Sequence, residues 1–194
     1  MENWKVAFLD EMIVTGGDMG LLKYYDPVSK EASGKLHVGD IFLTALATSN
    51  SGQFLAAGNN NGRLFIVNEV NKQKTVGLTP HHKILRDIAF IDSDSKLVTA
   101  SDDGSLKVID IPSEKQISTL EGHKEAVSSV SAHQNDEKVI LSCSFDKTIK
   151  AWDLREKTCL TTTVTGSPLW AVRSTGSHVL SGGENGILGL YSWG

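Results

Sequence analysis

The chain has 194 residues, of which 40% are hydrophobic and 22% charged, as in a globular domain with one core. A formal net charge of −4 without a cluster of Lys and Arg speaks against direct binding to nucleic acid, because phosphate-binding proteins carry a basic stripe. The sequence holds no apolar run long enough for a membrane span and no signal-peptide layout at its start. We therefore expect a cytoplasmic or nuclear protein.

A tight-turn signal recurs along the chain at nearly constant spacing. The turns lie at residues 17–20, 60–62, 102–104, 145–147 and 184–186, which gives a period of about 40–45 residues. Asn-Gly and Asp-Gly tolerate the positive φ that a hairpin turn of type I′ requires. The pattern predicts that each turn joins two strands.

The segments on both sides of these turns have the composition of strands. Small-residue strands are predicted before the turns, at 13–16, 55–58, 97–101, 140–143 and 179–182, and small side chains suit a strand between close-packed sheets. Further strands are predicted after the turns, at 21–26, 63–68, 105–110, 148–153 and 187–192. The full pattern of four strands is clearest at 126–132, 139–144, 148–153 and 158–164. No helical period appears, so we expect an all-β domain with repeats at 3–36, 37–79, 80–121, 122–165 and 166–194.

The fourth repeat contains Gly122-His123, Ser142, Asp146 and Trp152-Asp153. On these residues and on the period, the chain resembles the WD-repeat β-propeller family, in which each blade has four strands. The resemblance implies that His123, Ser142, Asp146 and Trp152 form a hydrogen-bonded network that locks a loop to a strand. A catalytic Ser-His-Asp triad is the alternative, but the spacing within a repeat favours the structural role. In the other repeats the signature is incomplete, and we expect the network to be absent or partial there.

The order of repeat variants supports a finer resemblance. Residues 3–8, 98–104, 144–153 and 169–172 are similar to the WD-repeat subunits of the superkiller helicase complex, whose animal relatives also occur in the Paf complex. This resemblance implies a non-catalytic scaffold that docks helicase and tetratricopeptide-repeat subunits and acts with the exosome in mRNA decay. The alternative is an adaptor of another complex, of the Paf transcription-elongation, chromatin or ubiquitin-ligase kind.

The resemblance also concerns the number of blades. The superkiller subunits have seven blades, whereas this chain supplies four repeats and most of a fifth. We therefore expect a chain truncated at its N-terminus. It should form an open arc with a three-stranded last blade, and its apolar end faces should be exposed or covered by a second molecule.

One position in the first strand of each repeat is a candidate for partner binding. This residue follows the apolar anchor of the strand and points to the opposite face. By resemblance it lies at the rim of the central channel, on the top surface, where partners of propellers dock. Trp and Arg are enriched in interface hot spots. Aligning the repeats places Trp4, Leu43, Arg86, Ser128 and Trp170 at this position. Alternatively, the two tryptophans fill the core between blades.

Other sequence features speak against catalysis and cofactors. The six histidines lack the spacing of a zinc site, and His81-His82 after Pro80 is predicted to lie in a solvated loop. The glycine-rich segment 182–186 leads into a strand, which excludes a dinucleotide-binding turn. We expect no cofactor and no bound metal. Cys143 and Cys159 fall on strands two steps apart, about 9–10 Å, so both are predicted to be free thiols.

Overall fold

The computed structural model describes residues 3–74 and 77–192, and they form five antiparallel sheets in chain order. Sheet 1 contains β1 (Asn3–Leu9), β2 (Met12–Gly17), β3 (Leu21–Tyr25) and β4 (Ala32–His37). Sheet 2 contains β5 (Leu43–Thr48), β6 (Phe54–Asn59), β7 (Leu64–Asn68) and the short β8 (Gln73–Lys74). Sheet 3 contains β9 (Leu85–Ile91), β10 (Lys96–Ser101), β11 (Ser105–Asp110) and β12 (Lys115–Glu121).

The last two sheets complete the series. Sheet 4 contains β13 (Val127–Ala132), β14 (Val139–Ser144), β15 (Thr148–Asp153) and β16 (Thr158–Val164). Sheet 5 contains only β17 (Leu169–Ser174), β18 (His178–Gly183) and β19 (Leu188–Ser192) within the described residues. The predicted all-β fold is confirmed. A single 3-10 turn, η1 (Asp18–Gly20), is the helical structure of the described chain, and it contains no helix that is long and apolar enough to cross a membrane.

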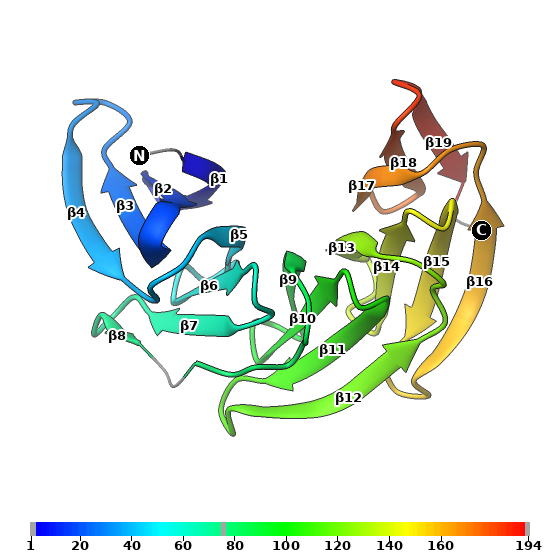
Figure 1. The fold of residues 1–194 in the computed structure, drawn as a ribbon, viewed down its shortest axis with the longest axis horizontal. Helices are drawn as coiled ribbons and strands as arrows, with labels where there is room; N and C mark the ends of the chain where they lie inside the picture. The colour runs from blue at the N-terminus through cyan, green and yellow to red at the C-terminus, as the bar shows by residue number, and fades with distance from the viewer. Residues whose placement is uncertain (1–2, 75–76, 193–194) are drawn as a thin grey trace.

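The sheets stand side by side along an arc whose two ends lie apart (Figure 1). The first strand of each sheet, β1, β5, β9, β13 or β17, lies on the concave side of the arc, and consecutive first strands contact one another. The fourth strands lie on the convex side. This arrangement is an open fan of propeller blades, as the repeat pattern predicted.

The hydrophobic cores lie between sheets rather than within them. Each of the four clusters of buried apolar residues draws its members from two consecutive sheets. The second strands lie between close neighbours, which explains their small residues: a Cβ at Gly58 would come within 2.5 Å of the Leu85 side chain. Larger residues in these strands would push the sheets apart.

The two end faces of the arc expose apolar side chains. On sheet 5, Leu188 is 83% and Leu190 64% exposed, and on sheet 1, Phe8 is 73% and Val6 62% exposed. Residues at matching positions in the inner sheets, such as Leu106 and Val108, are buried by the following sheet. The exposed end faces agree with the arc predicted from the repeats.

The two cysteines provide a test of the strand assignment. Both are free, with Cys143 buried and Cys159 exposed, and burial raises the pKa of the Cys143 thiol to about 12. Because the thiolate is the reactive form, we expect a thiol reagent such as Ellman's reagent to modify one thiol per native chain. In denaturant both thiols should react. Cys159→Ser should abolish the native reaction and Cys143→Ser should preserve it; rapid native labelling of both thiols would contradict the assignment.

Candidate functional site: the bulge rim and the polar networks beneath it

Each first strand carries a β-bulge near its start. The pairing of the first strand with the second skips one residue in every sheet, and a bulge of this kind re-aims a side chain. The skipped residues are Trp4, Thr44, Arg86, Ser128 and Trp170. We call these positions the bulge rim. The last four recur every 42 residues, so the column obtained by aligning repeats is a column of bulges.

One residue of the predicted column is wrong. The bulge in β5 is at Thr44, whereas Leu43 pairs in register with Asn59 and is fully buried in the core between sheets 1 and 2. A shift of one residue along a strand turns a side chain to the opposite face, so Leu43 cannot meet a partner. The backbone of Trp4 is in β1 at the bulge, but its side chain lies outside the described residues.

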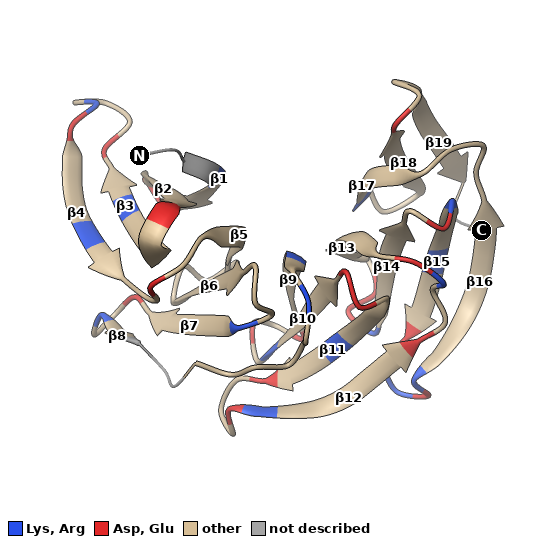
Figure 2. Ribbon diagram, in the orientation of Figure 1, with Lys and Arg blue, Asp and Glu red and all other residues tan. Residues whose placement is uncertain are grey.

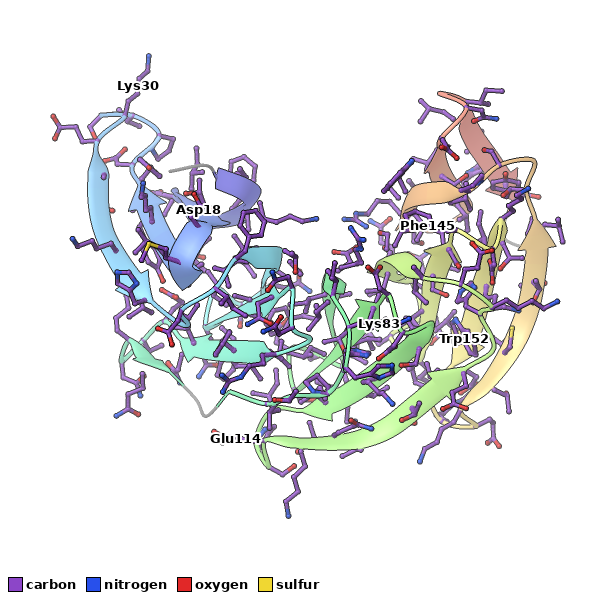
Figure 3. The ribbon with its side chains drawn as sticks, viewed as in Figure 1. Asp18, Lys30, Lys83, Glu114, Phe145 and Trp152 are labelled. Carbon is purple, nitrogen blue, oxygen red and sulfur yellow. The ribbon has the colours of Figure 1, made fainter. Side chains whose placement is uncertain are left out.

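Two rim residues present side chains that a partner can reach. Trp170 is 54% exposed, and its ring lies edge to face against Phe145 at a centroid distance of 4.6 Å (Phe145 is labelled in Figure 3). Arg86 is half-buried and donates two hydrogen bonds of 2.7 Å to the carboxylate of Asp102. Phe145 and Asp102 belong to the turns between second and third strands, so these turns and the bulges form one surface.

The other two described rim residues connect neighbouring sheets. The Thr44 hydroxyl donates to the backbone oxygen of Leu85 at 2.6 Å, and the buried Ser128 hydroxyl donates to that of Leu169, also at 2.6 Å. Each hydroxyl reaches the first strand of the next sheet. Ser128, predicted as a partner contact, therefore already uses its side chain to hold two blades together.

A chain of polar contacts joins three first strands below the rim. Asp87 accepts hydrogen bonds from the Ser129 hydroxyl at 2.7 Å and from the Val130 backbone N–H at 3.1 Å. Arg173 donates to the Ser129 hydroxyl at 3.0 Å. Because hydrogen bonds to charged groups are among the stronger ones, these contacts fix the relative positions of β9, β13 and β17.

The signature residues of the fourth repeat lie in one hydrogen-bonded network. His123 Nδ1 is 2.9 Å from Asp146 Oδ2, and His123 Nε2 is 2.7 Å from Ser142 Oγ. The Trp152 indole N–H donates to Ser142 Oγ at 2.8 Å (Trp152 is labelled in Figure 3). One arrangement of protons satisfies every group: His123 donates through Nδ1 to Asp146 and accepts through Nε2 from Ser142, which accepts from Trp152.

Burial sets the protonation state of this network. Burial lowers the pKa of His123, and the hydrogen bond and charge of Asp146 offset only part of this effect. Burial by itself raises the pKa of Asp146, but hydrogen bonds from Thr148, from the Lys124 backbone N–H and from His123 outweigh it and lower the pKa. A neutral imidazole beside an ionised carboxylate fits the proton arrangement above.

The geometry of this network does not support nucleophilic catalysis. The order Ser142–His123–Asp146 matches that of a catalytic triad, but Ser142 is fully buried and its hydroxyl oxygen already accepts the Trp152 N–H. A nucleophile needs an open side from which the substrate approaches. The buried network therefore acts as a structural lock, in which every polar group is satisfied.

The third repeat contains a second network that the sequence analysis missed. His81 is buried, with Nδ1 at 2.9 Å from Asp103 and Nε2 at 2.7 Å from the Thr99 hydroxyl. The prediction of a solvated His81 is wrong, whereas the next residue, His82, is exposed. Repeat spacing could have revealed it, because Thr99 and Asp103 lie 43 residues before Ser142 and Asp146. With Ile109 in the place of Trp152, this network is partial, as expected.

Two segments of the chain match a known repeat family. Residues 72–110 and 114–153 match the family described as WD domain, G-beta repeat. These segments cover most of sheet 3 and sheet 4, which hold the two histidine networks.

Known proteins resemble the chain over different lengths. The Target of rapamycin complex subunit wat1 of Schizosaccharomyces pombe is 27% identical over 187 residues, which are 94% of this chain and 58% of that protein. The SIR4-interacting protein SIF2 of Saccharomyces cerevisiae is 32% identical over 113 residues, or 58% of this chain and 21% of that protein. The solved structure of U3-55K superimposes with a TM-score of 0.87 at 20% identity, over 96% of this chain and 60% of that one. The chain therefore spans less than two thirds of the length of each of these three proteins.

Asp146→Ala tests the lock in sheet 4. The substitution leaves His123 and the Lys124 N–H without their acceptor, and we expect a loss of about 1–3 kcal/mol in the free energy of unfolding. Urea denaturation followed by Trp fluorescence measures the loss. Glu121→Ala, at an exposed position of β12, is the control and should change it little. Equal losses of unfolding free energy in the two variants would show that Asp146 does not stabilise sheet 4.

The two buried histidines predict how stability depends on pH. The pKa of His81, like that of His123, is lowered chiefly by burial, so the unfolded chain takes up protons before the folded chain does. The free energy of unfolding should therefore fall as pH drops below about 6.5. The carboxylates of Asp103 and Asp146 have lowered pKa values and lose their contribution only in the more acidic carboxyl range. His123→Gln should flatten the pH profile and the exposed control His178→Gln should preserve it; identical profiles would refute the assignment.

Proposed function

We propose that this chain, whose fold is that of a WD-repeat β-propeller, is a non-catalytic scaffold that holds partner proteins on the bulge rim. The observation that carries the proposal is the exposed Trp170 ring supported by Phe145. An aromatic ring held by a neighbour presents a large contact area at little cost in conformational entropy, which is the character of an interface hot spot.

The composition of the rim supports a protein partner rather than nucleic acid. Arg86 is neutralised by its bidentate pair with Asp102. Figure 2 shows Lys and Arg interspersed with Asp and Glu over the described residues, without a basic stripe along the arc. A nucleic-acid site would concentrate uncompensated positive charge on one surface.

One observation favours a structural role for the network of the fourth repeat over a catalytic one. The only Ser-His-Asp arrangement that the sequence suggested is buried and saturated with hydrogen bonds.

The names of related proteins also support the scaffold role. One is a subunit of the Target of rapamycin complex, one is named for its interaction with SIR4, and a Caenorhabditis briggsae relative is named as a DDB1- and CUL4-associated factor. Each name refers to a complex or to a protein partner. We transfer to this chain only the general role of holding proteins.

For the particular complex, we propose the superkiller assembly, on the resemblance of the repeat variants. Its helicase and tetratricopeptide-repeat subunits would be the partners, and the cytoplasm, the nucleus or both would be the location. The alternative is an adaptor of a Paf, chromatin or ubiquitin-ligase complex.

Affinity purification of the tagged chain from its own cells, followed by mass spectrometry, tests both levels of this proposal. Trp170→Ala should weaken binding of the helicase and tetratricopeptide-repeat subunits about thirtyfold and lower their recovery accordingly, because a hot-spot residue contributes about 2 kcal/mol or more. The matched control is Ile117→Ala, an exposed apolar residue on the outer strand β12. Equal recovery with both variants would reject the bulge rim as the site. Trp170-dependent recovery of a ligase or chromatin enzyme would replace the superkiller assignment.

A further inference from the structure

Sheets 2, 3 and 4 form two corresponding grooves at the end opposite the bulge rim. The bulges lie near the start of the first strands, whereas the turns after the first and third strands line both grooves. One groove, of about 390 Å³, lies between sheets 3 and 4, and the other, of about 410 Å³, lies between sheets 2 and 3. We call them the 3/4 groove and the 2/3 groove. Each is bounded by two four-stranded sheets, so neither end face of the arc contributes to it.

The floor of the 3/4 groove is aliphatic. Ile91 and Val108 belong to the buried core that sheets 3 and 4 share, and Leu154 packs against that core. On the outer strand β12, the lining residue Ile117 is 45% exposed. The groove therefore offers an apolar surface, and its volume suits one or two large side chains.

Four cationic side chains line the same groove: Lys96, Lys138, Arg155 and Lys157. Lys96 is paired with Asp92, and Arg155 is paired with Asp153 at 2.9 Å. Lys138 and Lys157 are exposed, and neither forms an ion pair with another described residue. These two ammonium groups come from different turns, so two separate positive charges remain for a ligand.

The 2/3 groove shows that the fold does not require these cations. Phe54 lies 42 residues before Lys96, and three residues lie 43 residues before the other cations: Ser95, Pro112 and Glu114. All four line the 2/3 groove, whose described lining residues include two acids and no Lys or Arg (Glu114 is labelled in Figure 3). Sheets of the same design thus pack against each other without positive charge, and the cations are particular to the 3/4 groove.

We propose that the 3/4 groove binds an acidic segment of a partner protein. An apolar side chain of the segment enters the groove, and carboxylates on neighbouring residues pair with Lys138 and Lys157. Because the two ammonium groups stand on separate turns beside an apolar floor, they match a chain that carries several carboxylates and an apolar residue between them.

This site is separate from the bulge rim and goes beyond the function proposed above. The groove and the rim lie at opposite ends of the sheets, so one chain can hold a protein at each. The segment belongs to a protein other than the rim partners, for which Ile117 serves as the control.

Nucleic acid is also negatively charged, but the groove suits it less well. Bases stack on aromatic side chains, whereas the floor of this groove is aliphatic. Two carboxylates, Asp92 and Glu137, also line the groove, and Glu137 accepts a hydrogen bond from the Ser93 hydroxyl at 3.2 Å. These carboxylates repel a continuous phosphate backbone, whereas a peptide can place uncharged residues beside them.

A fluorescein-labelled peptide, Gly-Asp-Asp-Leu-Leu-Asp-Asp-Gly, tests the proposal with this chain. Fluorescence anisotropy measures its binding, which we expect to saturate below about 1 mM protein. Replacing both leucines by serine removes the apolar contact, and replacing the aspartates by asparagine removes the charge. Each change should weaken binding about tenfold. These peptides leave the chain unaltered, so their result does not depend on how well a variant folds.

The 2/3 groove supplies the residues for a variant of the chain. Lys138→Ser with Lys157→Glu introduces the residues that the 2/3 groove has at these positions. The backbone accepts the second change, because Glu114 has a φ of 54° and Lys157 a φ of 56°. We expect this double variant to bind the peptide about tenfold more weakly.

The matched control makes the same change of charge away from the groove. Lys83→Ser lies at the rim end of sheet 3, and Lys30→Glu lies in the turn between the third and fourth strands of sheet 1 (both are labelled in Figure 3). Both lysines are exposed, and Lys30 has a φ of 61°, close to that of Lys157. This variant should bind like the unaltered chain.

Four results would overturn the proposal. They are no binding of the acidic peptide, equal binding of the peptides without leucine or without aspartate, equal affinity of the two double variants, and tighter binding of a fluorescein-labelled oligothymidylate than of the acidic peptide. The last result would assign the groove to nucleic acid.

Discussion

The structure depends on one constraint: among the described residues, no sheet has a hydrophobic core of its own. Every buried apolar cluster of the described residues is built from the facing sides of two consecutive sheets. The second strands carry small residues because side chains of the neighbouring sheet lie too close for larger ones. Hydrophobic burial of this kind is available only to a sheet that has a neighbour. The stability of each blade is therefore shared with the next, as in other repeat proteins.

Polar contacts then fix how neighbouring sheets are positioned relative to one another, which apolar packing does not specify by itself. Bulge hydroxyls on Thr44 and Ser128 bond to the next first strand, and the histidine networks tie the loops of sheets 3 and 4 to their second strands. With the backbone held in this way, the remaining bulge positions are free to display larger side chains. Trp170, in the last sheet of the described chain, is 54% exposed, and its ring packs edge to face against Phe145 of sheet 4.

Much of this architecture was predictable from the sequence, because the turns recur at a fixed period and the strands around them share one design. The site was predictable only in part. Repeat spacing signals the bulge in β5, because Thr44 lies 42 residues before Arg86, but the alignment on apolar anchors was one residue out of register there and selected Leu43. His81 was missed because Pro80 stands where the signature has glycine, although Thr99 and Asp103 mark the same network. The Phe145–Trp170 contact joins two sheets, and no pattern within one repeat reveals it.

The central claim is that partners dock on the bulge rim, and site-specific photo-crosslinking tests it most directly. Benzoylphenylalanine replaces Trp170 in one variant and Ile117, on the outer strand β12, in the other; both sites are exposed. The account predicts that irradiation of the assembled complex joins the partner to position 170 and leaves position 117 uncrosslinked. Crosslinks from position 117 with none from position 170 would place the partner on the convex side of the arc and contradict the account.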